Sequence, residues 1–265
     1  MASFARRLFS IVLWVAILAF PHSPLISQHI SDDEGTECRP RIRIVALGDS
    51  TTAEDDWSGV VGRVYPQLLG PSLESHGISA DVINAGIGDT TTREAVVRLD
   101  TDVRRHDPGI VIVQFGINDS WIDVDQGRTK PRLTREEYRD NLLTIIGTLR
   151  SDGATVILMT PNPMRWSDFY TQMFTEHSGT LNTRDARGIN RLLDLYAQDV
   201  RDLARDERVP LVDIMRKFEE YDESPGQSVN EWLIEGDLIH PNDEGHRVVC
   251  EMLTEEIVML LDVGP

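Results

Sequence analysis

The sequence predicts one α/β domain built on a parallel sheet with helices on both faces. Short apolar, β-branched runs alternate with amphipathic helical segments throughout the chain after residue 40. No internal repeat and no break in composition divides this region, and 265 residues suit one domain with a full hydrophobic core. The alternation of strands and helices requires long crossovers, which is typical of parallel pairing.

Each predicted strand is a short buried run that ends at a polar or glycine-containing turn. The predicted strands cover 42–47, 81–84, 110–115, 155–159 and 209–212. The predicted helices cover 60–73, 92–106, a segment behind the capping box of Thr134 and Glu137, 189–203 and 242–261. Residues 160–182, rich in proline and aromatic side chains, are expected to form a long loop.

The N-terminal residues 1–27 resemble a secretory signal. Arg6 and Arg7 precede an apolar run from Leu8 to Phe20, which is too short to cross a hydrocarbon core of ~30 Å. We expect a signal peptide or an uncleaved signal anchor, followed by a linker over 28–40 and the domain over 41–265. The protein is therefore expected to be exported, periplasmic or extracellular, or tethered to the membrane if the segment is retained. Because no lipobox precedes Cys38, a lipoprotein is not expected.

The two cysteines, Cys38 and Cys250, flank the predicted domain. Export permits disulfides, so a bridge that joins the two ends is one interpretation. The alternative is that Cys250 is a buried apolar residue on the last helix, beside Val248, Val249 and Met252.

The charge balance excludes some classes of partner. A formal net charge of -18 leaves no basic surplus for nucleic acid and disfavours docking on anionic lipid. No G-x-G-x-x-G follows the first strand and no Walker A motif is present, so nucleotide binding lacks its usual support. The acidity favours neutral acylated substrates over polyanionic ones, unless arginines gather at the site; Arg165 is the first candidate for such a cluster.

Polar motifs stand at four positions where ligands bind in such sheets, beyond the carboxyl ends of the strands. They are Gly48-Asp49-Ser50 after the first strand, Asn84-Ala85-Gly86-Ile87-Gly88-Asp89 after the second, Gly116-Ile117-Asn118-Asp119 after the third, and Asp237-Leu238-Ile239-His240 before the last helix. Each motif alone also fits an ordinary turn or helix cap. Their occurrence together, in chain order, favours a catalytic site.

These residues have the chemistry of acyl transfer. Ser50 needs a base to become a nucleophile, and His240 is the natural partner. Asp237, three residues earlier, can hold the other imidazole nitrogen and stabilise the imidazolium. The backbone N–H groups of Ser50 and Gly88 and the side-chain amide of Asn118 can form an oxyanion hole.

The four motifs together resemble those of the SGNH hydrolases, or GDSL-type esterases and lipases, over about residues 42–260. The resemblance implies a flavodoxin-like three-layer α/β/α sandwich with a five-stranded parallel sheet of order 2-1-3-4-5. It also implies that Ser50 is the nucleophile, His240 the base and acid, Asp237 its orienter, and Gly88 and Asn118 oxyanion donors. Thr51 stands where the name-giving leucine would be, a variant that resembles carbohydrate acetylesterases.

Aromatic residues near the motifs are candidates for substrate binding. Trp57 and Trp121 follow the first and third motifs. The predicted long loop carries Trp166 and Tyr170, which would contact substrate or form a small satellite core, and Arg165 beside them, which would contact substrate. Asp237, His240 and Asp243 are too few oxygen and nitrogen ligands for a metal site, so neither metal nor cofactor is expected.

The sequence thus predicts an exported serine ester hydrolase that works through an acyl-enzyme intermediate. The expected substrates are short-chain, mainly acetyl, esters of carbohydrates or small alcohols. The alternatives are a lysophospholipase or arylesterase on the same triad, and a catalytically silent carbohydrate-binding module of the same fold. The sequence predicts no oligomeric state.

Overall fold

Five parallel strands form the central sheet of the computed structural model, which describes residues 41–54, 64–177 and 188–262. The strands are β1 (Ile42–Gly48), β2 (Ala80–Gly86), β3 (Ile110–Gln114), β4 (Thr155–Met159) and β5 (Leu211–Val212). Their order is β2-β1-β3-β4-β5, which confirms the predicted topology. Gly48 pairs with Gly86 of β2 and with Gln114 of β3, so these three strands end at the same level.

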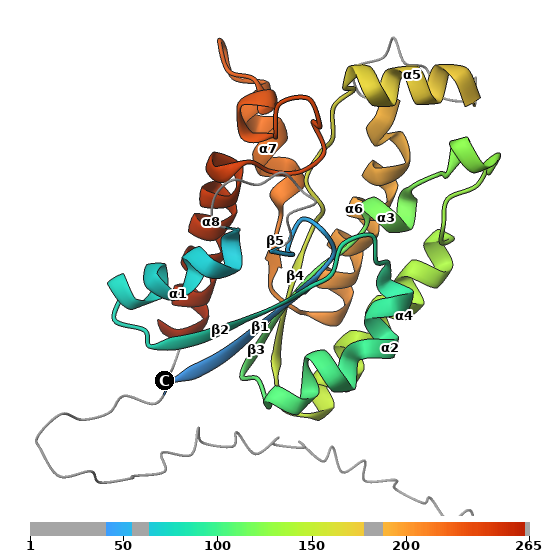
Figure 1. The fold of residues 1–265 in the computed structure, drawn as a ribbon. Helices are drawn as coiled ribbons and strands as arrows, with labels where there is room; N and C mark the ends of the chain where they lie inside the picture. Colours follow the sequence, from blue (N-terminus) through green and yellow to red (C-terminus); the bar gives the residue numbers. More distant parts are fainter. Residues whose placement is uncertain (1–40, 55–63, 178–187, 263–265) are drawn as a thin grey trace, which may run out of the picture. The chain divides into compact units, whose positions relative to one another are not determined.

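Helices cover both faces of the sheet (Figure 1). The α-helices are α1 (Tyr65–Ser75), α2 (Thr92–Asp102), α3 (Ile117–Ser120), α4 (Arg135–Ser151), α5 (Asp168–His177), α6 (Arg191–Glu207), α7 (Ile214–Asp222) and α8 (Asp243–Asp262). Single 3₁₀ turns are η1 (Arg104–His106), η2 (Val124–Gln126), η3 (Gly188–Asn190) and η4 (Val229–Trp232).

Alternate side chains of each strand supply two cores. Val45 and Leu47 of β1 pack with α2, α4 and α6, whereas Ile44 and Ala46 pack on the other face with α1, α7 and α8. This alternation follows from the two-residue repeat of a strand. The three-layer α/β/α sandwich is therefore as predicted, with α1 and α8 on one face and α2 and α4 on the other in Figure 1.

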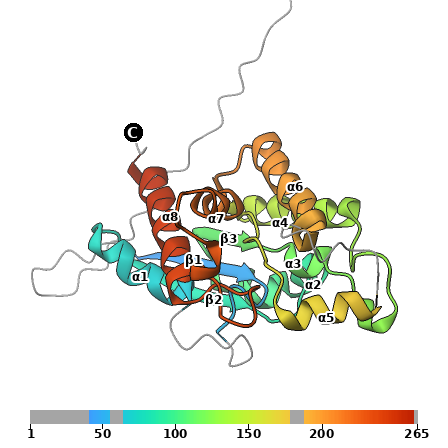
Figure 2. The same cartoon turned by 90° about the horizontal axis from the view of Figure 1, so that it is seen from above.

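The segment 160–182 differs from the predicted loop because it contains helix α5. Figure 2 shows α5 at the edge of the molecule, where it covers the segment after α3. Phe174 is its buried anchor, and it packs on Trp121 with ring centroids 5.5 Å apart. The helix is short, so contacts with residues outside it stabilise it.

Other boundaries differ from the predictions by a turn or more. Residues 55–63 lie outside the described chain, and α1 begins at Tyr65 with Pro66 in its first turn and Pro71 inside it. The helix predicted over 92–106 ends at Asp102, and α7 after β5 was not predicted. Strand β5 has only two residues.

The N-terminal prediction falls outside the described residues, which begin at Arg41. Cys38 also lies outside them, while Cys250 is buried on α8, with its sulfur 4.0 Å from the hydroxyl of Thr254. Within the described ranges, no helix is both long and apolar enough to span a membrane.

Candidate active site

Ser50 lies in a tight turn directly after β1. A Cβ on Gly48 would lie 2.1 Å from the Thr52 hydroxyl, so a residue without a side chain is required at this turn. The carboxylate of Asp49 accepts hydrogen bonds from the backbone N–H of Thr51 at 2.9 Å and from its hydroxyl at 2.8 Å. Burial raises the pKa of Asp49, and these bonds from Thr51 oppose the rise. The turn therefore presents Ser50 on a rigid support.

Ser50, His240 and Asp237 form one continuous chain of hydrogen bonds. The hydroxyl of Ser50 lies 2.9 Å from Nε2 of His240, and Nδ1 of His240 lies 2.7 Å from Oδ2 of Asp237. The same carboxylate oxygen accepts the backbone N–H of His240 at 2.8 Å. Ser50 and His240 are 8% and 7% exposed, so the chain is largely shielded yet still reachable.

The loop that carries the histidine is held in a strained turn. Leu238 adopts a positive φ of 58°, and its N–H donates to the carbonyl of Ile234 at 2.9 Å. Burial tends to raise the pKa of Asp237, but the hydrogen bonds from His240 and the charge on that ring hold it below the ordinary value. Asp237 is thus an anion at neutral pH and fixes the tautomer of His240.

Three hydrogen-bond donors face the same space as the Ser50 hydroxyl. Within the described residues, no acceptor engages the backbone N–H of Ser50 or that of Gly88. The amide of Asn118 donates one hydrogen to the carbonyl of Thr90 at 3.0 Å, which fixes its orientation and leaves the second hydrogen for a ligand. Such donors, fixed before a ligand arrives, are what stabilises an oxyanion.

Two side chains tie the loops of the site together. Asn84 donates to the carbonyl of Thr52 at 2.8 Å and accepts the N–H of Gly86 at 2.9 Å, so the turn after β1 is tied to the turn after β2. Asp119 accepts the N–H of Thr92 at 2.9 Å and its hydroxyl at 2.6 Å, which joins the motif after β3 to the start of α2. Burial raises the pKa of Asp119 to about 7.

Arg98 is a supporting residue that the sequence analysis missed. Its guanidinium donates to the carbonyl of Ala85 at 2.6 Å and to that of Gly48 at 2.9 Å, and so joins the ends of β1 and β2. It also pairs with Asp102 at 3.1 Å. The available signal was its position on the buried stripe of α2, beside Leu99.

The site opens into a cavity of about 680 Å³. Ser50, Gly88, Asn118 and His240 line it, and its walls include Trp121, Tyr170, Met173 and Ile87. The rings of Trp121 and Tyr170 meet edge to face with centroids 5.4 Å apart. The structure therefore places these two predicted aromatic residues against the catalytic groups, together with Met173 and Ile87, which the sequence analysis did not single out.

The other predicted substrate contacts are placed elsewhere. Trp57 lies outside the described residues. Trp166 packs on Phe174 with centroids 5.5 Å apart, in the satellite core that the sequence analysis offered as its alternative. Arg165 pairs with Asp222 at 2.7 Å and donates to the Met164 carbonyl, so it turns away from the cavity because those partners satisfy its charge.

No group of three or more His, Cys, Asp or Glu side chains suited to a metal ion occurs in the described parts of the chain.

Known proteins are similar to this chain. The model of the GDSL-like Lipase/Acylhydrolase family matches residues 46–248. The uncharacterized lipoprotein YqeF of Bacillus subtilis (strain 168) is 32% identical over 226 residues, which are 82% of this chain and 90% of that protein. An arylesterase of Vibrio mimicus is 25% identical and covers 82% of this chain and 88% of its own length.

Solved structures agree with the fold. A lipase/acylhydrolase from Enterococcus faecalis has a TM-score of 0.61 at 25% identity, and the match covers 82% of this chain and 95% of that one. The acetylxylan esterase Axe2 from Geobacillus stearothermophilus has a TM-score of 0.63 at 22% identity, over 82% and 94% of the two chains. The chain thus belongs to the GDSL-like lipase/acylhydrolase family of carboxylic ester hydrolases.

Proposed function

We propose that this protein is an exported serine esterase that removes short acyl groups, acetyl above all, from carbohydrates or small alcohols. The observation that carries the proposal is the unbroken hydrogen-bonded chain from Ser50 through His240 to Asp237 at the floor of an open cavity. A serine hydroxyl needs this arrangement to lose its proton as it attacks an ester.

The reaction has two halves. Nε2 of His240 takes the proton of Ser50 while the serine oxygen bonds to the ester carbonyl carbon, and the imidazolium then protonates the departing alcohol. In the second half, His240 removes a proton from water as the water oxygen attacks the acyl-serine. The imidazolium then returns that proton to the Ser50 oxygen as the bond to the acyl carbon breaks and the acid leaves. Asp237 stays ionised throughout and stabilises the imidazolium.

Negative charge on the ester oxygen is met by the N–H groups of Ser50 and Gly88 and by the second amide hydrogen of Asn118. Each donor of this kind stabilises the transition state by about 3 kcal/mol when it is well aimed. The bond from Asn118 to Thr90 supports this role because it fixes the amide before substrate arrives.

Several observations support the substrate class. Trp121 and Tyr170 line the cavity and offer flat faces of the kind that pack on sugar rings. Among the similar proteins are an acetylxylan esterase and an arylesterase. Export is supported by the apolar segment after Arg7, and the relative YqeF is described as a lipoprotein.

The proposal is tested by replacing Ser50 with alanine. Hydrolysis of 4-nitrophenyl acetate should fall to the background rate while the circular dichroism spectrum stays that of the wild type. Ser151→Ala, on the exposed end of α4, is the matched control and should retain full activity. Undiminished turnover by Ser50→Ala would contradict the assignment.

The substrate class is tested with 4-nitrophenyl esters from acetyl to palmitoyl and with acetate release from acetylated xylan. We expect kcat/KM to be highest for the acetyl ester and to decline as the chain lengthens, as the proposed preference for acetyl groups requires. A maximum at long chains would instead favour the lysophospholipase alternative, and selectivity for aryl leaving groups without acetate release would favour an arylesterase.

A further inference from the structure

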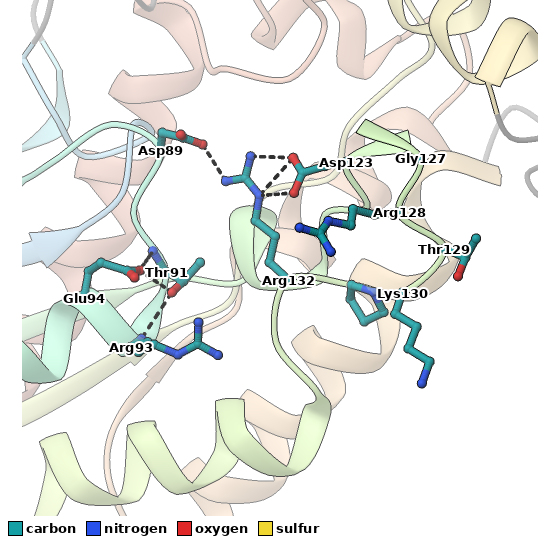
Figure 3. Close-up of a pocket in the computed structure, with 11 residues that line it drawn as sticks. Asp89, Thr91, Arg93, Glu94, Asp123, Gly127, Arg128, Thr129, Lys130 and Arg132 are labelled. Atoms are coloured by element: carbon teal, nitrogen blue, oxygen red, sulfur yellow. Dashed lines mark hydrogen bonds and ion pairs between the residues drawn. The ribbon is translucent and has the colours of Figure 1, made fainter. Parts of the chain in front are cut away.

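A second cavity, of about 600 Å³, adjoins the active-site cavity (Figure 3). It is bounded by the first turn of α2 and by residues 127–132, which lie between η2 and α4. Asp89, Asp123 and Arg132 line both cavities, so the two spaces meet along these three side chains. A molecule whose ester reaches Ser50 can extend past them into the second cavity.

Positive charge gathers in this second cavity, in contrast to the rest of the chain. Arg93, Arg128, Lys130 and Arg132 line it, although the formal net charge of the protein is -18 and only two of its residues are lysines. An anion in this cavity interacts mainly with these nearby cations, because charges farther away than a Debye length of about 8 Å are largely screened.

The three acidic side chains of the cavity are already engaged. Arg132 bonds to Asp89 and, at 2.8 Å, to Asp123, as Figure 3 shows. Glu94 accepts the backbone N–H of Thr91 at 2.9 Å as part of the capping box of α2. Asp89 and Asp123 thus bond to Arg132, and Glu94 to the start of α2, so none of the three forms an ion pair with Arg128.

Arg128 and Lys130 are the two cations of this cavity that have no carboxylate partner among the described residues. In the described ranges, no carboxylate lies within ion-pair distance of Arg128 or of Lys130, whereas Arg93 pairs with Glu137 at 2.6 Å. Figure 3 shows the guanidinium of Arg128 turned toward the Arg132 side chain, while Lys130 extends away from it.

We propose that this cavity is a subsite for a carboxylate on the substrate, with Arg128 as its main ligand. The proposal rests on the ester hydrolase function above and names its substrate class: an acylated oligosaccharide that carries a uronic acid. One free guanidinium supplies one bidentate contact, which matches the geometry and the single charge of a carboxylate. The subsite reverses the expectation, drawn from net charge, that neutral esters are preferred, and the arginine responsible is Arg128 rather than Arg165.

The test is a binding measurement that needs no turnover. Calorimetry on the Ser50→Ala protein compares a xylo-oligosaccharide substituted with glucuronic acid with the same backbone unsubstituted. The acidic ligand should bind about tenfold tighter at low salt. The advantage should shrink in ~1 M NaCl, where the Debye length is about 3 Å.

Variants in the same background locate the effect. Arg128→Gln should remove the preference for the acidic ligand, and Arg128→Lys should restore part of it because charge returns without the planar fork. Arg216→Gln is the matched control: it removes an exposed arginine on α7 that lines neither cavity, and the preference should remain. Arg128 is exposed on a loop, so its variants should fold normally, and circular dichroism checks this.

Equal affinity for the two oligosaccharides, or a preference that survives Arg128→Gln, would overturn the subsite. Stronger competition by inorganic phosphate than by free glucuronate would assign the cavity to phosphate instead of a carboxylate and would also overturn it. Hydrolysis of 4-nitrophenyl acetate by the wild-type protein tests the ester hydrolase function separately. If that hydrolysis is absent, the proposed function is contradicted, while the binding result still stands.

Discussion

Replacement of Arg98 by methionine should destabilise the turns after β1 and β2 without changing any reacting group. The side chain is 10% exposed and donates two charge-assisted hydrogen bonds, to the carbonyls of Ala85 and Gly48. Each such bond contributes about 1.5 kcal/mol or more, so the free energy of unfolding should fall by about 3 kcal/mol. For a domain of this size that corresponds to a loss of roughly 6–12 °C in Tm.

The same substitution should lower activity because the two carbonyls lie just before Ser50 and Gly88 in the chain. A displacement of about 1 Å between nucleophile and oxyanion donor costs up to ~100-fold in rate, and we expect kcat to fall by tenfold to that limit with little change in KM. Urea unfolding and 4-nitrophenyl acetate kinetics, both well below Tm, measure the two effects. Arg105→Met, on an exposed 3₁₀ turn, is the control.

Unchanged unfolding free energy and unchanged kcat in Arg98→Met would refute the reasoning. Arg98→Lys separates charge from geometry, since one ammonium cannot reach two carbonyls in the same fork. It should recover part of the stability but little of kcat.

Three further predictions concern the reacting groups and the pH dependence of stability. Asp237→Asn should lower kcat by ~10⁴-fold, because the amide favours the wrong tautomer of His240, and a loss below tenfold would contradict its role. Asn118→Ala should lower kcat by ~10²-fold to 10³-fold with KM nearly unchanged, and a proportional rise in KM instead would assign Asn118 to ground-state binding. Burial raises the pKa of Asp119 to about 7 and lowers that of His246 to about 4, from ordinary values of 3.8 and 6.5. As pH rises between about 4 and 6.5, the native state therefore keeps a proton on Asp119 that the unfolded chain loses, and stability falls. His246 acts in the opposite direction, because over the same range the unfolded chain keeps a proton that the native state has lost. The two effects, each ~1.4 kcal/mol per pH unit, should nearly cancel in urea titrations of the wild type, whereas His246→Asn should lose stability with rising pH and Asp119→Asn should gain it.

Much of the fold was predictable because each strand has a strong local signal. The β-branched run Ile110–Gln114 is fully buried, and such runs are continuous only when both sheet faces are covered. Helix α5 was not predictable in the same way, because its one buried residue, Phe174, packs on Trp121, which comes from a distant part of the chain. The predicted last strand was longer than the two residues of β5 that pair in the structure, and these pair only with β4.

The residues of the candidate site were predictable by type, since serine, histidine and aspartate at strand ends have few other uses as a set. Their supports were harder to find. The place of Arg98 on the buried stripe of α2 was a weak signal, and its two carbonyl partners are known only from the structure. Arg165 was expected to contact substrate, but its partner could not be read from the sequence: it forms an ion pair with Asp222.

The sequence by itself determined the α/β architecture and the identities of the groups that can carry out acyl transfer, because periodicity and residue chemistry are local properties. Only the tertiary structure decided that Ser50 and His240, which are 190 positions apart, lie within hydrogen-bond distance. It also decided that Trp121 and Tyr170 face the cavity while Trp166 does not, and that Arg128 rather than Arg165 presents a free charge beside it. The physical reason is that strand register brings the loop ends to one level, while the direction of each side chain depends on neighbours distant in the chain.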